Sequence, residues 1–345
     1  MSNLKLITIV MSAFLLSLFY YTRPDASSGE NTIRPNIEAK ETVSTPMLNK
    51  KMCLPLPSAI AVKRAPLKNC SLPYVVMFDG GRLGNQMCQY LSLNLLRKQY
   101  GIKIAIRTKM KNILTTHFEN IWVPLNDSNC YNHHTKAILF NDLYRKLFAF
   151  SESNRRSYPL SESHFVRNYP CPLDLLLPWR EKLKGVLVFK PEILEKARRQ
   201  IRSALETAGI VMSSDITLIT VHVRRTDYIE HMKSRYGLRP LTKNYFSRAF
   251  DYFRDRFPRP IFLVTTDDRK WCESHILAPD VLYAGTEKEP VVDIALLSQG
   301  NHTVVSFGTF GFVGAFLGRG LIVHPDNNPT YYCEDSKVTI SVPAS

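Results

Sequence analysis

The sequence predicts an α/β protein with parallel sheets, built as two domains behind an N-terminal membrane-targeting segment. Its 345 residues are 45% hydrophobic and 22% charged, which is enough apolar content for one large core or two of medium size. From Tyr74 a short strand, a glycine loop and a helix follow one another, and after Asp215 buried strands alternate with helices. Such alternation is typical of parallel sheets covered on both faces.

Residues 6–22 contain an uncharged apolar run that is flanked by Lys5 and Arg23. The run is somewhat shorter than a typical hydrocarbon core requires, which suits a thin early-secretory membrane. We interpret it as a signal-anchor transmembrane helix, with a cleaved signal peptide as the alternative. Positive charge before the span keeps residues 1–5 as a cytoplasmic tail and places the rest of the chain in the lumen. This topology predicts a single-pass type II membrane protein.

The segment after the anchor has the features of a lumenal protein. Residues 23–72 are rich in Pro, Ser, Thr, Asn and Lys with little periodic hydrophobicity, which predicts a flexible stem. The seven cysteines have no close CxxC or Cys/His spacing, so they indicate disulfides rather than a zinc site. Their odd number leaves at least one unpaired within the chain, and the pairing does not follow from the sequence. Three Asn-x-Ser/Thr sequons are candidate glycosylation sites, at Asn69, Asn126 and Asn301.

The chain carries a formal net charge of +15, from 45 Lys and Arg against 30 Asp and Glu. This excess favours a polyanionic partner, such as nucleic acid, an anionic membrane surface or a phosphorylated small molecule. The sequence contains no zinc-finger spacing, no RNA-recognition aromatic signature and no basic region with a heptad zipper. We therefore expect no nucleic-acid partner.

The folded body divides near residue 210 into two predicted domains. Residues 73–210 open with the strand YVVMF and a helix over 85–99, and continue mostly as helices and loops. Residues 211–345 contain the buried strands and helices of a parallel sheet. The predicted strands are ITLITVHV (216–223), IFLVTT (261–266), VLYAG (281–285), TVVSF (303–307) and LIVH (321–324), and the helices lie near 243–256, from Lys270, near 290–299 and over 308–318.

A run of polar residues, HVRRTDY from His222 to Tyr228, overlaps the end of the strand ITLITVHV. In open α/β sheets ligands collect at the carboxyl ends of the strands. Arg224 and Arg225 suit a diphosphate there, because guanidinium groups stay protonated and present a planar fork of donors. The alternative is a surface ion pair of one arginine with Asp227 and a hydrogen-bonded core histidine. Since side chains alternate along a strand, His222 and Arg224 should share one face, and Arg225 should point elsewhere.

Two glycine-rich segments also join a strand to a helix start. The first, GGRLGNQM, contains Gly84 and Asn85 and lacks both the P-loop Lys-Ser/Thr and the GxGxxG spacing. The second, NHTVVSFGTFG, contains Ser306 and Thr309. Backbone N–H groups and the helix dipole at such a junction favour an anion, although a tight turn is the alternative for the first loop taken alone.

Together these segments resemble the successive motifs of animal α1,2-fucosyltransferases. The motifs are GRLGNQM, HVRRTDY, LVTTDDRKWC, DIALLSQGNHT and SFGTFGFVGAFLGRG, and they follow in order from about Tyr74 to Pro325. The resemblance implies a GT-B-like fold of two Rossmann-type halves, GDP-fucose as the donor, inversion at the anomeric carbon and no required metal or other cofactor. It further implies an acceptor-side half at 73–210 and a GDP-fucose-binding half at 211–345, in a Golgi enzyme.

The resemblance also assigns roles to residues of the site. It implies that Arg224, Asp227 and His222 form the catalytic set, with the two arginines on the donor diphosphate. The donor-binding residues that it implies are Arg224, Arg225, Gly84, Asn85, Asp268, Ser306, Thr309 and Phe310. The expected reaction is transfer of fucose to the 2-hydroxyl of a terminal galactose on a glycoprotein or glycolipid.

Several alternatives stay open. Thr226 makes HVRRTD similar to the version in α1,6-fucosyltransferases, so another linkage, α1,6 or α1,3, is the first of them. The catalytic base is one of Asp79, Asp227 and Glu230. The acidic pair at 267–268 is a candidate metal site in a metal-dependent transferase. Other functions that share these features are a lumenal sulfotransferase and an anchored lectin that binds glycans without turnover.

Overall fold

The computed structural model describes most of the chain from residue 72 onward. The predicted tail and anchor, and the predicted stem up to residue 71, lie outside the described residues, as do Asn69 and Asn126. In the ranges that are described, no helix is long and apolar enough to cross a membrane. The described residues are 72–121, 124–125, 134–153, 157–168, 170–285, 288–329 and 338–345.

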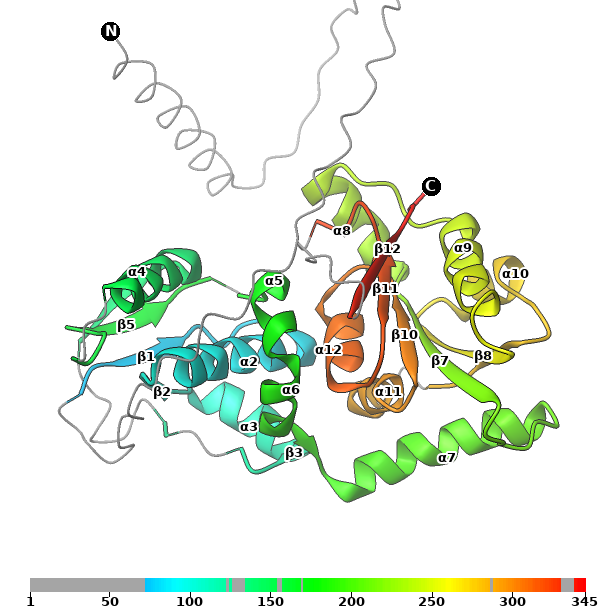
Figure 1. Cartoon of the computed structure of the whole chain (residues 1–345), viewed down its shortest axis with the longest axis horizontal. Helices are drawn as coiled ribbons and strands as arrows, with labels where there is room; N and C mark the ends of the chain where they lie inside the picture. Colours follow the sequence, from blue (N-terminus) through cyan, green and yellow to red (C-terminus); the bar gives the residue numbers. More distant parts are fainter. Residues whose placement is uncertain are drawn as a thin grey trace, which may run out of the picture. The chain divides into compact units, whose positions relative to one another are not determined.

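The protein has a mixed α/β fold with parallel sheets, and residues 74–189, called here the first-sheet part, contain the smaller one (Figure 1). Its strands are β1 (Tyr74–Met77), β2 (Lys103–Ala105), β4 (Thr135–Ile138) and β5 (Ser163–Val166). They are ordered β2-β1-β5-β4, and all neighbours pair in parallel. An antiparallel pair joins β3 (Phe118–Glu119) to β6 (Val188–Phe189). The helices are α2 (Leu83–Tyr100), α3 (Thr108–His117), α4 (Phe140–Glu152), α5 (Leu173–Leu176) and α6 (Arg180–Leu183), with 3₁₀ turns η1 (Leu177–Trp179) and η2 (Lys184–Val186).

The strand and helix predicted after Tyr74 are confirmed as β1 and α2, both of which are mostly buried. The prediction of mostly helices and loops from about 110 to 205 missed the short strands β3 and β6 as well as β4 and β5. β4 is an edge strand with exposed central residues, and β5 buries the polar side chains of Ser163 and His164. Both strands therefore lack the continuous apolar run that marks a buried parallel strand.

The second-sheet part, residues 191–342, contains the larger parallel sheet. Its strands are β7 (Ile216–Val223), β8 (Arg259–Thr266), β9 (Val281–Tyr283), β10 (His302–Val305), β11 (Ile322–Pro325) and β12 (Thr339–Val342). The order is β12-β11-β10-β7-β8-β9, with every pair parallel. The predicted apolar runs correspond to β7 through β11, and β12 was not predicted. If β7 is counted as the first strand of this part and β12 as the sixth, the order is that of doubly wound nucleotide-binding sheets. In such sheets the direction of winding reverses between the first strand and the fourth, here β7 and β10.

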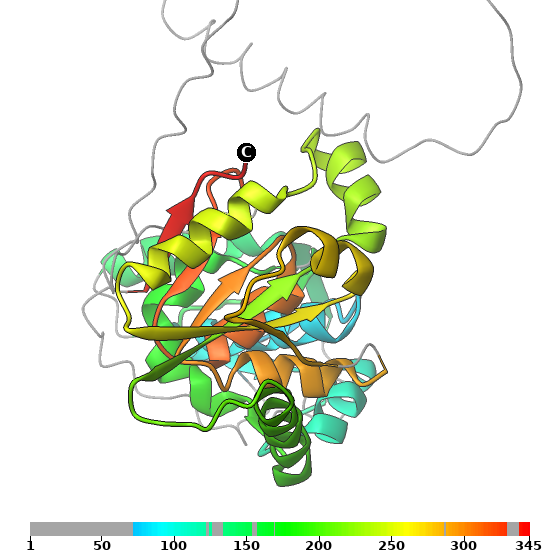
Figure 2. The same ribbon diagram turned by 90° about the vertical axis from the view of Figure 1, so that its right-hand side faces the viewer.

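Helices cover both faces of this sheet, as predicted (Figure 2). They are α7 (Pro191–Thr207), α8 (Thr226–Tyr236), α9 (Lys243–Arg254), α10 (Arg269–His275), α11 (Pro290–Leu297) and α12 (Thr309–Leu317). On one face, Phe246, Phe250 and Phe253 of α9 form an apolar cluster with alternate residues of β7. On the other face lie α11 and α12. α7 precedes the predicted domain boundary at residue 210, yet it packs against α11 of the second-sheet part.

Arg180 in α6 holds the end of α12 across the two parts. Its side chain is buried, and its guanidinium donates to the carbonyl oxygens of Ala315 and Gly320 over 2.7 Å and of Phe316 over 3.0 Å. Burial lowers the pKa of Arg180 to about 10, which leaves the group charged at neutral pH. A cation at the C-terminus of a helix satisfies the last carbonyls and opposes the negative end of the dipole. One side chain of the first-sheet part thus fixes the C-terminal end of α12.

A disulfide joins Cys88 in α2 to Cys171 before α5, with a sequence separation of 83 residues. We expect the double variant Cys88→Ala, Cys171→Ala to lose about 2–5 kcal/mol of unfolding free energy, because a cross-link over a long loop restricts the unfolded chain. Chemical denaturation of the purified protein measures this loss. Cys272, which is a free and buried thiol, provides the control. Cys272→Ala should lower the unfolding free energy by less than the double variant does. An equal loss of unfolding free energy in the two proteins would contradict the stabilising role of the disulfide.

Candidate active site

The strand order identifies where a ligand binds in the second-sheet part. In doubly wound sheets the crevice lies outside the carboxyl ends of the two strands at which the order reverses. Here those strands are β7 and β10, which pair in parallel as far as His222 and Val305. The HVRRTDY motif leaves the end of β7, and Ser306 directly follows β10. The fold therefore brings these two motifs together at the position that the topology assigns to a ligand.

Two helices begin next to each other at this position. A Cβ at Gly84, in the first turn of α2, would lie 3.1 Å from Cα of Phe310 in the first turn of α12. The hydroxyl of Thr309 donates to Oδ1 of Asn85 over 2.8 Å. Neither helix has a side-chain cap on its N-terminal N–H groups. Two uncapped, positive helix ends that converge favour an anion between them.

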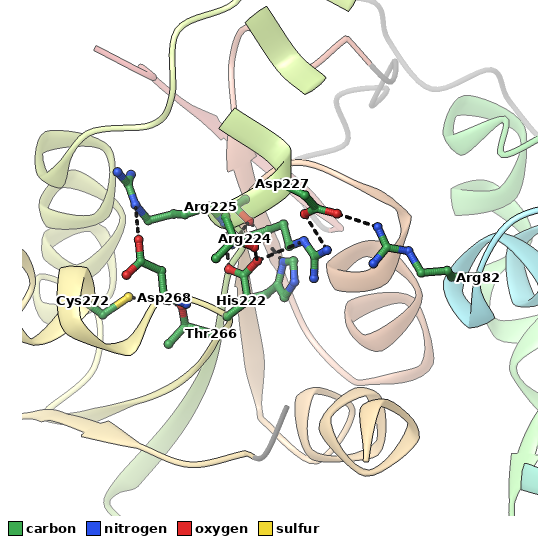
Figure 3. A network of polar contacts seen from close by, with 11 residues as sticks. Arg82, His222, Arg224, Arg225, Asp227, Thr266, Asp268 and Cys272 are labelled. Atoms are coloured by element: carbon green, nitrogen blue, oxygen red, sulfur yellow. Dashed lines mark hydrogen bonds and ion pairs between the residues drawn. The ribbon is translucent and has the colours of Figure 1, made fainter. Parts of the chain in front are cut away.

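Arg224 extends from the end of β7 and is held by two carboxylates (Figure 3). Its Nη2 donates to Asp227 over 2.6 Å, and its Nε lies 3.2 Å from Asp267. Its backbone N–H donates to the hydroxyl of Ser306 over 2.9 Å. The side chain keeps 23% of its surface exposed. The guanidinium is therefore oriented in advance and still open to a ligand, which is the arrangement that stabilises developing charge most effectively.

Arg225 points away from Arg224, as the alternation along the strand predicts (Figure 3). Its guanidinium carbon lies 3.7 Å from the ring centre of Trp271, and its Nη1 donates to the carbonyl oxygen of Leu241 over 3.0 Å. Its Nε lies 3.3 Å from Asp268, which also caps α10 by accepting from the Trp271 N–H. Arg225 and Asp268 thus stabilise the side of the sheet that carries α10. Of the two predicted phosphate-binding arginines, Arg224 faces the converging helices.

His222 is buried beneath this site, with 4% of its surface exposed. Its ring stacks on Phe310 with 5.3 Å between centroids, and its Nδ1 lies 3.2 Å from Oγ of Ser306. Gly311 leaves room for the ring, because a Cβ there would collide with Nδ1. Burial, and then the charge of Arg224, lower the pKa of His222 to about 3. The imidazole is therefore neutral at physiological pH and acts by positioning Ser306 and Phe310.

Asp227 connects the first-sheet and second-sheet parts. Besides Arg224, it accepts from Nη2 of Arg82 in the glycine loop before α2, over 2.6 Å. Burial raises the pKa of Asp227, but the hydrogen bonds from Arg82 and Arg224 outweigh this effect and hold the pKa below its usual range. A carboxylate with two arginine partners is a poor proton acceptor, which argues against Asp227 as the base. Arg82 was not predicted as a site residue, because one arginine in a glycine loop has no informative spacing.

The other two candidate bases lie in different surroundings. Asp79 is buried and pairs with Arg107 at 3.0 Å, within the first-sheet part. Glu230 lies one turn beyond Asp227 on α8 and is exposed. Of these two carboxylates, Glu230 is the one that solvent and a ligand can reach.

A cavity of about 180 Å³ opens beside Arg224 on the α12 side of the sheet. His222 and Phe310 line it, together with Asp293 of α11. Asp293 is 6% exposed, and a Cβ at Gly285 would come within 2.9 Å of its Oδ1. A buried carboxylate near an anion site suits a ligand that carries N–H donors as well as phosphates. Asp293 was not predicted as a site residue, because its neighbours in α11 are apolar and mostly buried.

Asp267 and Asp268, the candidate metal pair, are both engaged by donors. Asp267 accepts from the backbone N–H of Arg225 over 2.8 Å and from the hydroxyl of Thr226. Among the residues that the structure describes, no group of three or more His, Cys, Asp or Glu side chains could hold a metal ion. The acidic pair thus orients the loop that carries the two arginines.

Asn301, the sequon that lies within the described ranges, is exposed just before β10. Its Oδ1 accepts from the backbone N–H of Leu218 over 2.9 Å, and Thr303 of the same sequon is fully buried. A glycan at this asparagine would have to be attached before Thr303 is buried by folding. Glycosylation of Asn301 stays a prediction.

The sequence profile of glycosyl transferase family 11 matches residues 42–332. The chain belongs to glycosyl transferase family 11. The resemblance of its motifs to those of α1,2-fucosyltransferases is confirmed by the names of curated relatives.

Curated relatives of this family 11 chain carry fucosyltransferase names. Galactoside 2-alpha-L-fucosyltransferase Sec1 of Mus musculus is 34% identical over 253 residues, which cover 72% of this chain and 65% of that protein. Galactoside alpha-(1,2)-fucosyltransferase 1 of Rattus norvegicus is 31% identical over 290 residues, which cover 80% of this chain and 72% of that protein. The matched segment thus spans about two thirds of the length of these relatives.

Solved structures similar to this family 11 chain include fucosyltransferases at low identity. A variant of Arabidopsis thaliana FUT1 in complex with GDP has a TM-score of 0.48 at 15% identity and covers 75% of this chain and 72% of that one. Fucosyltransferase NodZ from Bradyrhizobium has a TM-score of 0.45 at 14% identity, and the match covers 73% of this chain and 95% of that one.

The neutral, buried His222 predicts how the stability of this family 11 enzyme depends on pH. Its pKa is about 3 in the fold and close to 6.5 in an unfolded chain. Between these values the unfolded chain binds a proton that the native state does not, so the free energy of unfolding falls by about 1.4 kcal/mol per pH unit on acidification. Chemical denaturation of wild type and His222→Gln at pH 7, 6 and 5 should show the wild-type advantage shrinking below about pH 6. A gap that stays constant would mean that His222 binds protons equally in the folded and unfolded chains, so that burial does not lower its pKa.

Proposed function

We propose that this protein transfers fucose from GDP-fucose to the 2-hydroxyl of a terminal galactose, with inversion at the anomeric carbon. The galactoside α1,2-fucosyltransferase names of its relatives support this assignment. So does the motif series from GRLGNQM to SFGTFGFVGAFLGRG. We further propose that the first-sheet and second-sheet parts correspond to the acceptor-side and donor-binding halves of a GT-B-like enzyme.

The observation that carries the proposal is the convergence of two uncapped helix ends beside Arg224. Cleavage of the sugar–phosphate bond builds positive charge on the fucose ring and negative charge on the departing GDP. Prearranged donors at the β-phosphate lower this barrier. In this site the donors are the N–H groups at the starts of α2 and α12 and the guanidinium of Arg224. Asp227 and Asp267 hold that guanidinium in place, so little reorganisation is needed when the phosphate arrives.

The neighbouring cavity supports a guanine nucleotide as the donor. Guanine presents N–H donors on its pairing edge, and a carboxylate accepts two hydrogen bonds side by side. Asp293 supplies such a carboxylate in the wall of the cavity. Uracil has a single N–H on the corresponding edge, so the same carboxylate favours GDP over UDP.

The cellular setting and the absence of a metal requirement are part of the same proposal. Arg224, Arg82 and the helix ends supply positive charge at the phosphates without a cation. We propose a single-pass type II protein of the Golgi membrane, with residues 1–5 cytoplasmic, an anchor at 6–22 and a stem at 23–72. The partners are then GDP-fucose and a galactose-terminated glycan on a glycoprotein or glycolipid.

Arg224→Lys tests the leaving-group role directly. Lysine keeps the charge but loses the planar fork, and removal of one preorganised donor typically lowers the rate about 10²- to 10³-fold. We expect a fall of that order in kcat for fucosyl transfer, with the melting temperature little changed. Arg225→Lys is the matched control, because that side chain stacks on Trp271 on the other side of the sheet. It should lower the melting temperature more and kcat less, and the reverse pattern would pass the leaving-group role to Arg225.

Ligand-induced stabilisation tests the donor and the metal requirement. A ligand that binds the native state raises the melting temperature, and we expect GDP to do so more than UDP. Asp293→Asn should reduce the difference between the melting-temperature shifts caused by GDP and UDP, because the amide has one acceptor oxygen where the carboxylate has two. Fucosyl transfer should persist in excess EDTA. Abolition by EDTA and rescue by Mn²⁺ would favour a metal-dependent reaction at the acidic pair 267–268.

A further inference from the structure

Helix α8 is the least buried of the helices that begin at the site. Of its 11 residues, Met232 alone is buried. The helix starts directly after Arg225 and runs outward from the carboxyl ends of the strands (Figures 1 and 2). A helix that buries so little apolar surface gains little stability from packing. Its exposed side chains are therefore available to a ligand.

Aromatic rings form a connected row along α8. The rings of Tyr228 and His231 are 5.1 Å apart, and those of His231 and Tyr236 are 6.1 Å apart. Tyr228 is half-buried, whereas His231 is exposed and Tyr236 keeps 47% of its surface exposed. The guanidinium of Arg235 lies 5.9 Å from the Tyr236 ring. The row thus offers flat apolar faces with polar groups at their edges, which is the composition of binding sites for small polar ligands.

The inner end of this row touches the anion site. A Cβ at Gly308, the residue before α12, would lie 2.8 Å from the hydroxyl oxygen of Tyr228. The Arg224 guanidinium lies 5.9 Å from the Tyr228 ring. From Tyr228 to Tyr236 the helix rises about 12 Å, which is long enough for a disaccharide. A glycan that lies along the row would therefore present its terminal sugar next to the donor phosphates.

We propose that Tyr228, His231 and Tyr236 are the contribution of the donor-binding half to the surface that binds the galactose-terminated acceptor, on the helix whose first turn meets the acceptor-side half through Arg82 and Asp227. One face of a galactose ring carries several C–H groups and little polarity, so it packs on an aromatic face, while its hydroxyls remain free to bond at the ring edges. Tyr228 contacts the terminal galactose next to the donor, and Tyr236 contacts the sugar that precedes it. This assignment rests on the proposed function, because it requires a galactoside acceptor.

Acceptor length separates this role from a general effect on the enzyme. We expect Tyr236→Ala in the full-length protein to raise KM about tenfold for a β-galactosyl disaccharide, a loss in the range of one aromatic contact. KM for methyl β-galactoside, which cannot reach Tyr236, should stay unchanged. KM for GDP-fucose and the slow hydrolysis of GDP-fucose without acceptor should also stay unchanged. Tyr236→Trp should have a KM for the disaccharide close to that of wild type, because it keeps an aromatic face for the sugar to pack on.

Phe148→Ala on α4 is the matched control, because it removes an aromatic side chain of similar exposure, 44%, in the first-sheet part. It should leave KM for both acceptors unchanged. Equal KM values for the disaccharide in wild type and Tyr236→Ala would overturn the proposed surface, as would parallel changes for both acceptors. Wild-type protein that neither binds GDP nor hydrolyses GDP-fucose would overturn the proposed function instead, and the acceptor surface with it.

Discussion

The contact between the first turns of α2 and α12 is the constraint on which the site depends. Gly84 has no side chain, so the backbone of α12 at Phe310 approaches to contact distance. Gly311 and Gly314 let the same helix lie against His222 of β7 and Leu297 of α11. Because of these three close approaches, α12 packs on both parts of the chain, and its positive end lies beside that of α2. A site for a polyanion thus results from helix packing before any charged side chain is added.

The charged side chains around this contact are arranged so that each arginine has a fixed position. Asp227 holds Arg82 and Arg224 together, and Asp267 holds Arg224 from the other side. Bringing positively charged groups close costs electrostatic energy, and the carboxylates offset it while no phosphate is bound. A diphosphate would take over part of that role. The neutral state of His222 is consistent with this balance, since a further cation beneath Arg224 would raise the cost.

Helix α12 is held at both ends by the first-sheet part. Its N-terminal turn meets Gly84 and Asn85, and its C-terminal carbonyls accept from Arg180. The buried guanidinium of Arg180 opposes the negative end of the helix dipole, and an anion at the other end opposes the positive end. Donor binding would therefore strengthen the connection between the two parts at the point where they already touch. By contrast α8 has one buried residue and gains little stability from packing.

The sequence by itself determined five of the six described strands of the second sheet, β7 to β11, and the loops at their carboxyl ends. Continuous apolar runs and strand–glycine–helix junctions are local patterns, and the alternation of side chains already separated Arg224 from Arg225. Only the tertiary structure decided that Arg82 pairs with Asp227 across 145 residues, that Cys88 pairs with Cys171, and that Asp293 lines the cavity. It also decided the place of β4 and β5, whose polar residues obscure their strand pattern. These features depend on packing between segments far apart in the chain, and local patterns carry no information about such packing.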